Sequence, residues 1–172
     1  MIAKATRIAA VSRPIEAQSL PLKPEVLVLG GGITGISIAQ ALAKSGIHVF
    51  LLERGTLLGG RVLELQKFYN RSEEVKQWVE KKVSEVSKTS NITILTRSEL
   101  KRLDGHLGRF QAKIKVQDGT ETVLQVSAIV VATGYETLRE TKGIFGHKRV
   151  ITLSEMEGLL SQTRSPSIQW EG

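Results

Sequence analysis

The sequence predicts an α/β fold in which a parallel β-sheet is flanked by helices and carries an additional three-stranded β-meander. Three observations support this prediction. An apolar run at residues 26–29 leads directly into glycines and then into an amphipathic helix pattern, which is the order of a strand–turn–helix unit. Further buried-strand patterns occur at 47–52 and 128–131. Between them, alternating apolar and polar residues with Asp-Gly pairs indicate antiparallel strands.

The first strand is followed at once by glycines in a G-x-G-x-x-G pattern, Gly30, Gly32 and Gly35. In a Rossmann-like turn the first glycine permits the bend, the second lets the backbone approach a pyrophosphate, and the third packs the helix on the strand. The helix begins with free N–H groups at its positive dipole end, and we expect Ile33 and Thr34 to supply such groups. The motif therefore predicts a Rossmann-like dinucleotide-binding turn.

The second strand delivers a carboxylate, Glu53, at the position where an acid accepts hydrogen bonds from an adenosine ribose. The alternative is a glycine-rich turn that binds nothing. The ordered succession of strand, glycines, helix, strand and acid favours the binding site, because this context is what the motif requires. We therefore expect Glu53 to bind the ribose and Arg54 to line the phosphate and ribose side.

The chain of 172 residues has a length that suits one domain with a real core. Residues 1–24 are expected to form an amphipathic helix and a proline-containing linker, 25–161 the Rossmann-like domain, and 162–172 a tail. The first 13 residues contain no acidic residue, so a targeting sequence is the alternative to an ordinary lead-in helix.

Between Glu53 and the strand at 128–131 we expect one helix, one strand and the meander. Ser72 is a favourable N-cap for a helix that ends near Lys88, and its apolar stripe predicts Trp78 as a core anchor. The next strand is expected at 91–95. The meander strands are expected at 97–103, 109–116 and 121–126, with turns at Asp104-Gly105 and the following 106–108, and at Asp118-Gly119.

The composition excludes several kinds of redox centre on this chain. There is no cysteine, so disulfides, thiolate metal sites, iron–sulfur clusters and a redox-active dithiol are excluded. The three histidines lack metal-ligand spacing, and no constellation indicates a general acid or base, so we expect no metal site and no catalytic residue. The net charge of +7 is spread thinly and only 5% of residues are aromatic, which argues against a nucleic-acid partner. No apolar run has membrane-spanning length, so we expect a cytoplasmic protein without membrane insertion.

The glycine loop, Glu53 and the Gly59-Gly60-Arg61 segment together resemble the FAD-binding half of the glutathione-reductase-like flavoproteins. The resemblance implies FAD as the cofactor, with the glycine pair beside the pyrophosphate. It also implies that Arg61 offsets the phosphate charge, a task that suits the fixed donors of a guanidinium.

A second motif of the same family is the strand at 128–131 ending in Ala132-Thr133-Gly134. The resemblance implies that this strand runs beside the first one and that its Ala-Thr-Gly end lies close to the cofactor. It further implies that backbone groups near Leu100, where the sheet passes into the meander, meet the adenine.

Four segments narrow the resemblance to the flavoprotein subunit of the heterodisulfide reductases. They are Gly-Gly-Gly-Ile-x-Gly-Ile at 30–36, Asn-Ile-x-Ile-Leu-Thr at 91–96, Val-Val-Ala-Thr-Gly-Tyr at 130–135 and Val-Ile-Thr at 150–152. The resemblance implies an electron-transfer oxidoreductase with iron–sulfur or other electron-transfer partner subunits. The chain departs from the family in lacking its cysteines, its late Gly-Asp segment and a second glycine motif. We therefore expect a domain that is incomplete relative to full flavoenzymes.

Three functions stay open at this point. The first is an FAD-dependent oxidoreductase domain or fragment that works within a larger complex or as a homo-oligomer. The second is an NAD(P)-dependent oxidoreductase, against which the Gly-Gly-Arg and Ala-Thr-Gly motifs speak. The third is a non-catalytic scaffold that keeps the fold after losing the site, for which the missing Gly-Asp segment speaks.

Overall fold

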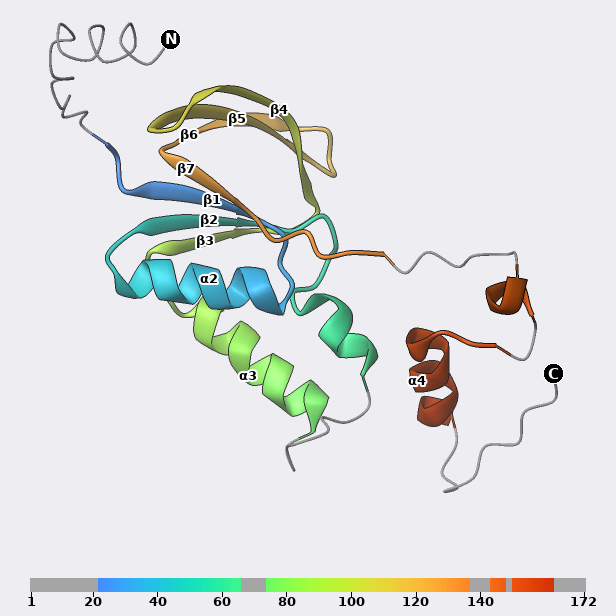
Figure 1. The fold of residues 1–172 in the computed structure, drawn as a ribbon. Helices are drawn as coiled ribbons and strands as arrows, with labels where there is room; N and C mark the ends of the chain where they lie inside the picture. The colour runs from blue at the N-terminus through green and yellow to red at the C-terminus, as the bar shows by residue number, and fades with distance from the viewer. Residues whose placement is uncertain (1–21, 66–73, 137–142, 148–149, 163–172) are drawn as a thin grey trace, which may run out of the picture.

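A computed structural model of the protein describes residues 22–65, 74–136, 143–147 and 150–162. Its centre is a four-stranded parallel sheet in the order β3-β2-β1-β7 (Figure 1). These strands span Glu25–Leu29 (β1), His48–Leu52 (β2), Ile92–Leu95 (β3) and Ala128–Val131 (β7). The predicted return of the last strand beside the first is confirmed, because β7 pairs with β1 in parallel.

Two helices cover one face of this sheet and an antiparallel meander covers the other (Figure 1). The helices are α2 (Ile33–Lys44) and α3 (Val75–Ser87). The meander consists of β4 (Ser98–His106), β5 (Arg109–Val116) and β6 (Glu121–Val126). Three shorter elements are the 3-10 helices η1 (Gly60–Glu64) and η2 (Gly143–Gly146) and the helix α4 (Leu153–Gln162). This architecture confirms the predicted fold class.

The sheet is buried on both faces, which explains why its strands are continuous apolar runs. In β1, Val26 and Val28 belong to the helix-side core with Ile36 of α2. Leu27, which points to the opposite face, packs in the meander-side core with Ala112 of β5. The sheet therefore holds two separate cores together, and β1 contributes to both.

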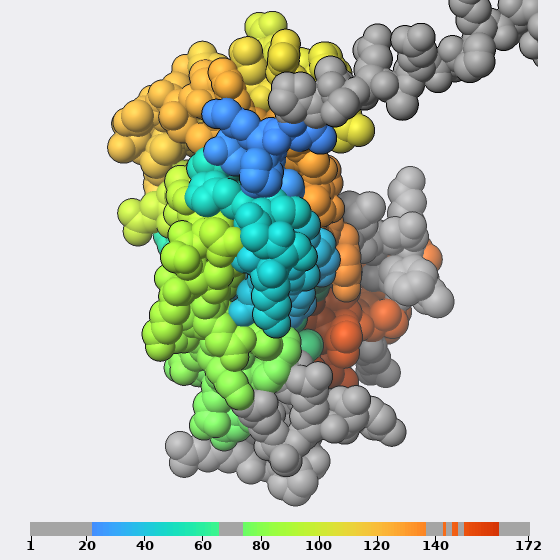
Figure 2. All heavy atoms as spheres, turned by 90° about the vertical axis from the view of Figure 1, so that its left-hand side faces the viewer, coloured from blue at the N-terminus to red at the C-terminus, as the bar shows by residue number. Residues whose placement is uncertain are grey.

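Figure 2 shows α2 and α3 side by side on the outer surface of the helix layer. Their exposed faces meet through Gln40, whose Nε2 donates to Glu85 Oε2 at 3.2 Å, and Lys82 pairs with the same carboxylate at 3.0 Å. Among the described segments, no helix is long and apolar enough to cross a membrane. The charged outer face of these helices is solvated, as their amphipathic sequences predict.

The hairpin between β4 and β5 differs from the predicted one. β4 continues to His106, so Asp104 and Gly105 lie within the ladder opposite Gln111 and Phe110, and the turn is the two-residue Leu107-Gly108. A register shift between Leu100 and Arg102 inserts one extra residue into β4. The expectation of a turn at Asp104-Gly105 is therefore wrong, because the bulge shifts the register and a two-residue loop then closes the hairpin.

The predicted start of α3 is also wrong. The helix begins at Val75, with Glu74 in the N-cap position, whereas Ser72 lies outside the described residues. Val75, Val79 and Val86 are buried, and Trp78 is only half-buried. Three small β-branched side chains therefore anchor this helix, and the expectation of Trp78 as a core anchor is wrong.

Asn91 fastens the end of α2 to the start of β3. Its Nδ2 donates to the carbonyl oxygens of Ala43, at 2.8 Å, and of Ile47, at 3.0 Å. The last carbonyl groups of a helix have no partner within the helix. The Ala43 carbonyl accepts from Gly46 N at 3.0 Å, and the Asn91 amide adds a second donor to it and a donor to the carbonyl of Ile47 in the following loop.

We expect Asn91→Ala to lower the free energy of unfolding by about 1–3 kcal/mol, because it leaves two partly buried carbonyl groups without this donor. Urea denaturation measures the change. Gln77→Ala is the matched control, since the assigned hydrogen bond of the Gln77 amide goes to Glu74, at 3.5 Å on the exposed surface of α3. Equal stability of the two variants would contradict the assigned role of Asn91.

Candidate functional site

The candidate site lies at the carboxyl-terminal edge of the parallel sheet. Leu29 at the end of β1 is level with Leu52 of β2 and Val131 of β7. The segments that follow these strands therefore emerge side by side, at the edge where ligands bind in open α/β sheets. They carry three groups of predicted site residues, namely the glycine loop, the acid after β2 and the Ala-Thr-Gly segment.

Two of the motif glycines are required by packing inside the protein. Gly30 has φ of 109°, and a Cβ atom built there would lie 2.3 Å from the carbonyl oxygen of Ala132. A Cβ atom at Gly35 would lie 1.8 Å from the carbonyl oxygen of Gly30. These contacts bring β7 and α2 against the glycine loop and match the predicted roles of the first and third glycines.

Gly32 is different, because nothing in the described part of the protein requires a glycine there. Its φ of −70° is open to any residue, and a Cβ atom built on it would meet no atom within 4 Å. Gly32 occupies the N-cap position of α2, and no side chain caps the helix. The space in front of the helix is therefore open, which suits a group that approaches the backbone closely.

The first turn of α2 presents backbone donors to this space. The first hydrogen bond of the helix runs from Ile36 N to Gly32 O at 2.9 Å, so the N–H groups of Ile33, Thr34 and Gly35 have no acceptor inside the helix. Together with the helix dipole, these donors favour an anionic group.

Glu53 is held in a fixed position beside the loop. Its Oε2 accepts a hydrogen bond from Gly31 N at 2.7 Å and its Oε1 accepts one from Gly55 N at 2.6 Å. The side chain is half-buried, and each carboxylate oxygen has a second lone pair for a further donor. The carboxylate is therefore oriented by the backbone and can still accept hydrogen bonds from a pair of hydroxyl groups.

Gly60 lies directly beside Gly32. Gly59 N donates to Gly31 O at 2.8 Å, and a Cβ atom at Gly60 would lie 2.9 Å from the Cα atom of Gly32. The segment after Glu53 thus folds back onto the glycine loop, and Gly60 borders the open space at Gly32. The contact of Gly60 with a pyrophosphate stays a prediction.

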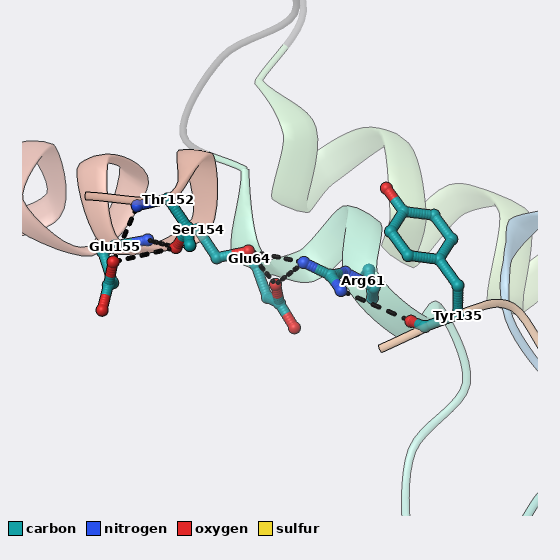
Figure 3. A network of polar contacts seen from close by, with 6 residues as sticks. All are labelled: Arg61, Glu64, Tyr135, Thr152, Ser154 and Glu155. Atoms are coloured by element: carbon teal, nitrogen blue, oxygen red, sulfur yellow. Dashed lines mark hydrogen bonds and ion pairs between the residues drawn. The ribbon is translucent and has the colours of Figure 1, made fainter. Parts of the chain in front are cut away.

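The two predicted arginines contact the segment that follows β7. Arg54 forms an exposed ion pair with Glu136 at 3.0 Å. Arg61 lies 4.9 Å from the ring centroid of Tyr135 and donates to the carbonyl oxygen of the same residue at 3.4 Å (Figure 3). Both arginines thereby connect the loop after β2 to the end of β7, which the sequence did not show. Their predicted contacts with phosphate and ribose stay a prediction.

The Ala-Thr-Gly segment and Leu100 take different places. Ala132 N donates to Leu29 O at 2.8 Å, and Thr133 and Gly134 follow it as exposed residues at the site edge. The side chain of Leu100 packs in the meander-side core, so only its backbone is a candidate for contact with an adenine. The structure thus brings the glycine loop, Glu53, Gly60 and the Ala-Thr-Gly segment together and leaves Leu100 at the junction with the meander.

Arg97 shapes that junction, and the sequence gives no signal for it. Its φ of 50° lies in the left-handed region, which is uncommon for a residue other than glycine. Arg97 N donates to Gly55 O at 2.9 Å, and the next residue, Ser98, donates its N–H to Glu53 O at 3.0 Å. The turn between β3 and β4 therefore supports the loop that carries the acid.

Shifted pKa values occur in the meander and on α3. The hydrogen bond from Lys101 lowers the pKa of Glu99, and the one from Lys113 lowers the pKa of Glu121, both in the meander. On α3 the hydrogen bond from Lys82 lowers the pKa of Glu85. These carboxylates lie in exposed ion pairs of solvated surfaces. Within the described ranges, no group of three or more His, Cys, Asp or Glu residues could hold a metal ion.

Comparison with known proteins agrees with this geometry. Residues 4–166 match the pyridine nucleotide-disulphide oxidoreductase family. The chain belongs to this family. The resemblance to flavoproteins predicted from the glycine loop and the Ala-Thr-Gly segment is confirmed, and membership of this oxidoreductase family points to flavin binding.

Similar proteins of known type include subunits of the heterodisulfide reductases. The chain is 33% identical over 115 residues to a heterodisulfide reductase subunit-like protein of Archaeoglobus profundus. It is 30% identical over 115 residues to one subunit of the H(2):CoB-CoM heterodisulfide,ferredoxin reductase of Methanothermobacter thermautotrophicus. Each alignment covers 67% of this chain, which spans only 16% and 18% of the two relatives. The predicted similarity to this subunit of the heterodisulfide reductases is thus confirmed for one domain of a much longer protein.

The solved structure of L-proline dehydrogenase from P. horikoshii has a similar fold. The TM-score is 0.57 at 23% identity, and the match covers 64% of this chain and 22% of that one. The two chains therefore share this fold over the aligned residues.

Proposed function

We propose that this domain binds FAD at the carboxyl-terminal edge of its parallel sheet and serves electron transfer in a multi-subunit oxidoreductase. The observation that carries the proposal is the open space at Gly32, in front of an uncapped helix N-terminus. A glycine that no internal contact requires indicates a group that comes close to the backbone from outside.

The residues present fit the two polar parts of the adenosine diphosphate half of FAD. The pyrophosphate would lie against Gly32 and the N–H groups of Ile33 and Thr34, and the oriented carboxylate of Glu53 would accept from the ribose hydroxyls. Gly60 borders the same space, so Arg61 would approach the phosphates from the adjoining position. When bound, FAD would supply the redox chemistry, while this chain binds and orients it.

Partner subunits with their own electron carriers complete the proposal. The relatives are named as one subunit of heterodisulfide reductases, which implies an assembly with other subunits. This chain has no cysteine to hold an iron–sulfur cluster. We therefore place such clusters on other chains or other domains that exchange electrons with the flavin.

An absorbance spectrum of the purified chain, followed by calorimetric titration with FAD and with NAD⁺, tests the proposal. We expect either a copurified flavin spectrum or saturable FAD binding that raises the melting temperature. Binding of NAD⁺ without any binding of FAD would show that the site takes a nicotinamide cofactor in place of a flavin. Absence of any dinucleotide binding would support a non-catalytic scaffold.

Glu53→Ala is expected to weaken FAD binding by about 1–3 kcal/mol, or roughly 5- to 150-fold in Kd, because ribose hydroxyls lose their acceptor. Calorimetry measures the affinity. Glu80→Ala is the control, since Glu80 is an exposed carboxylate on α3. Because Glu53 also accepts from Gly31 and Gly55, each variant is first compared by urea denaturation. An unchanged affinity in a folded Glu53→Ala protein would refute the ribose assignment.

A further inference from the structure

Arg61 joins three segments that are far apart in the sequence. Its guanidinium donates to Ser154 Oγ at 2.5 Å, pairs with Glu64 at 3.4 Å, and lies over the ring of Tyr135 (Figure 3). Figure 3 shows the guanidinium between the aromatic ring on one side and the start of α4 on the other. Arg61 therefore makes the contact with α4 and also follows Gly60, which lies against the glycine loop (called the glycine cradle below).

A capping box at the start of α4 fixes the backbone around Ser154. Thr152 and Glu155 form a capping box, in which Glu155 Oε2 accepts from Thr152 N at 2.7 Å and Thr152 Oγ1 accepts from Glu155 N at 3.3 Å. Ser154 is the second residue of the helix, between the two capping residues. Its hydroxyl also donates to Glu64 at 3.4 Å, so it links Arg61 and Glu64 to the first turn of α4.

The position of Arg61 gives it two competing sets of partners. It follows Gly60, which lies against Gly32 at the open end of α2. Phosphate oxygens at the glycine loop would be strong acceptors for the guanidinium and would compete with the contacts it makes to the Ser154 hydroxyl and the partly exposed Glu64 carboxylate. A guanidinium that turns toward phosphates gives up the geometry it needs for Ser154.

We propose that α4 is a strap docked on Arg61, and that a dinucleotide bound at the glycine cradle releases it by taking Arg61. The inference rests on the proposed function, because it requires the phosphates to lie at Gly32. Binding and docking are then coupled reciprocally: whatever weakens the contact of α4 with Arg61 strengthens dinucleotide binding by the same factor.

Ser154→Ala tests the coupling, because it removes the hydroxyl from Arg61 and leaves both capping residues intact. We expect FAD to bind about three- to tenfold more tightly to this variant, the range of one typical intramolecular hydrogen bond at a partly exposed site. Calorimetry measures the affinity. Hydrogen exchange measures the protection of the α4 amides with and without FAD. FAD should lower the protection of α4 in the wild-type chain, and Ser154→Ala should lower it without FAD.

Ser161→Ala is the matched control on the same helix, since the Ser161 hydroxyl donates only to the carbonyl of Gly158 among its assigned hydrogen bonds. It should leave FAD affinity unchanged. FAD binding that leaves both the exchange of α4 and the affinity of Ser154→Ala unchanged overturns the strap and keeps the proposed function. Failure of FAD to bind any of the variants overturns both.

Discussion

Gly35→Ala is expected to destabilise the domain by about 3 kcal/mol, because the added methyl group would lie 1.8 Å from the carbonyl oxygen of Gly30. No rotation of a side chain relieves this contact, since both partners belong to the backbone. Either α2 moves away from β1, opening the buried core around Ile36, or the glycine loop shifts away from β7. Urea denaturation followed by circular dichroism measures the loss of stability.

Gly158→Ala makes the same chemical change in another helix and is expected to have the opposite sign. A Cβ atom at Gly158 in α4 would meet nothing within 4 Å, and alanine favours helix over glycine by up to about 1 kcal/mol. We expect an unchanged or slightly higher stability for this variant. Helix propensity favours alanine at both positions, so equal stability changes in the two variants would contradict the assigned contact between position 35 and the carbonyl oxygen of Gly30.

The glycine loop illustrates which features of the candidate site could be predicted from the sequence and which could not. Spacing and context predicted the strand, the turn, the helix and the acid, because the G-x-G-x-x-G pattern combines a backbone requirement with a packing requirement. The sequence could not separate the glycines by cause. Glycine is required at position 30 by the close contact with Ala132 and at position 35 by the close contact with Gly30, whereas Gly32 faces open space. Only a structure distinguishes internal packing from an opening toward a ligand.

The contacts between distant segments could not be predicted either. Arg61 was expected to offset the phosphate charge, and its contacts with Ser154 and Tyr135 were not foreseen, because they depend on how the chain after β7 returns to η1. The extended β4 has a similar cause, since one inserted residue near Leu100 moves the hairpin turn beyond the Asp-Gly pair. Local patterns carry no information about such long-range pairings, which tertiary packing decides.

Gly32→Ala is expected to weaken FAD binding by about 2–3 kcal/mol, roughly 30- to 150-fold in Kd, while the protein stays folded. The methyl group would project into the space where the pyrophosphate is proposed to approach the backbone, and no atom of the described residues lies within 4 Å of it. Alanine is a poorer N-cap than glycine, so a stability loss of less than about 1 kcal/mol is expected from that source. Calorimetric titration with FAD and urea denaturation of the same preparation measure the two effects.

Thr34→Ala is the matched control for the cradle. Thr34 is exposed in the first turn of α2, and its proposed contribution to phosphate binding is a backbone N–H group that alanine retains. Its affinity for FAD should therefore equal that of the wild-type chain. A Gly32→Ala protein that binds FAD as tightly as the Thr34→Ala protein would show that the open space at the helix N-terminus is not where the cofactor lies. A selective loss at Gly32 would instead locate the pyrophosphate at this glycine, which no contact among the described residues requires.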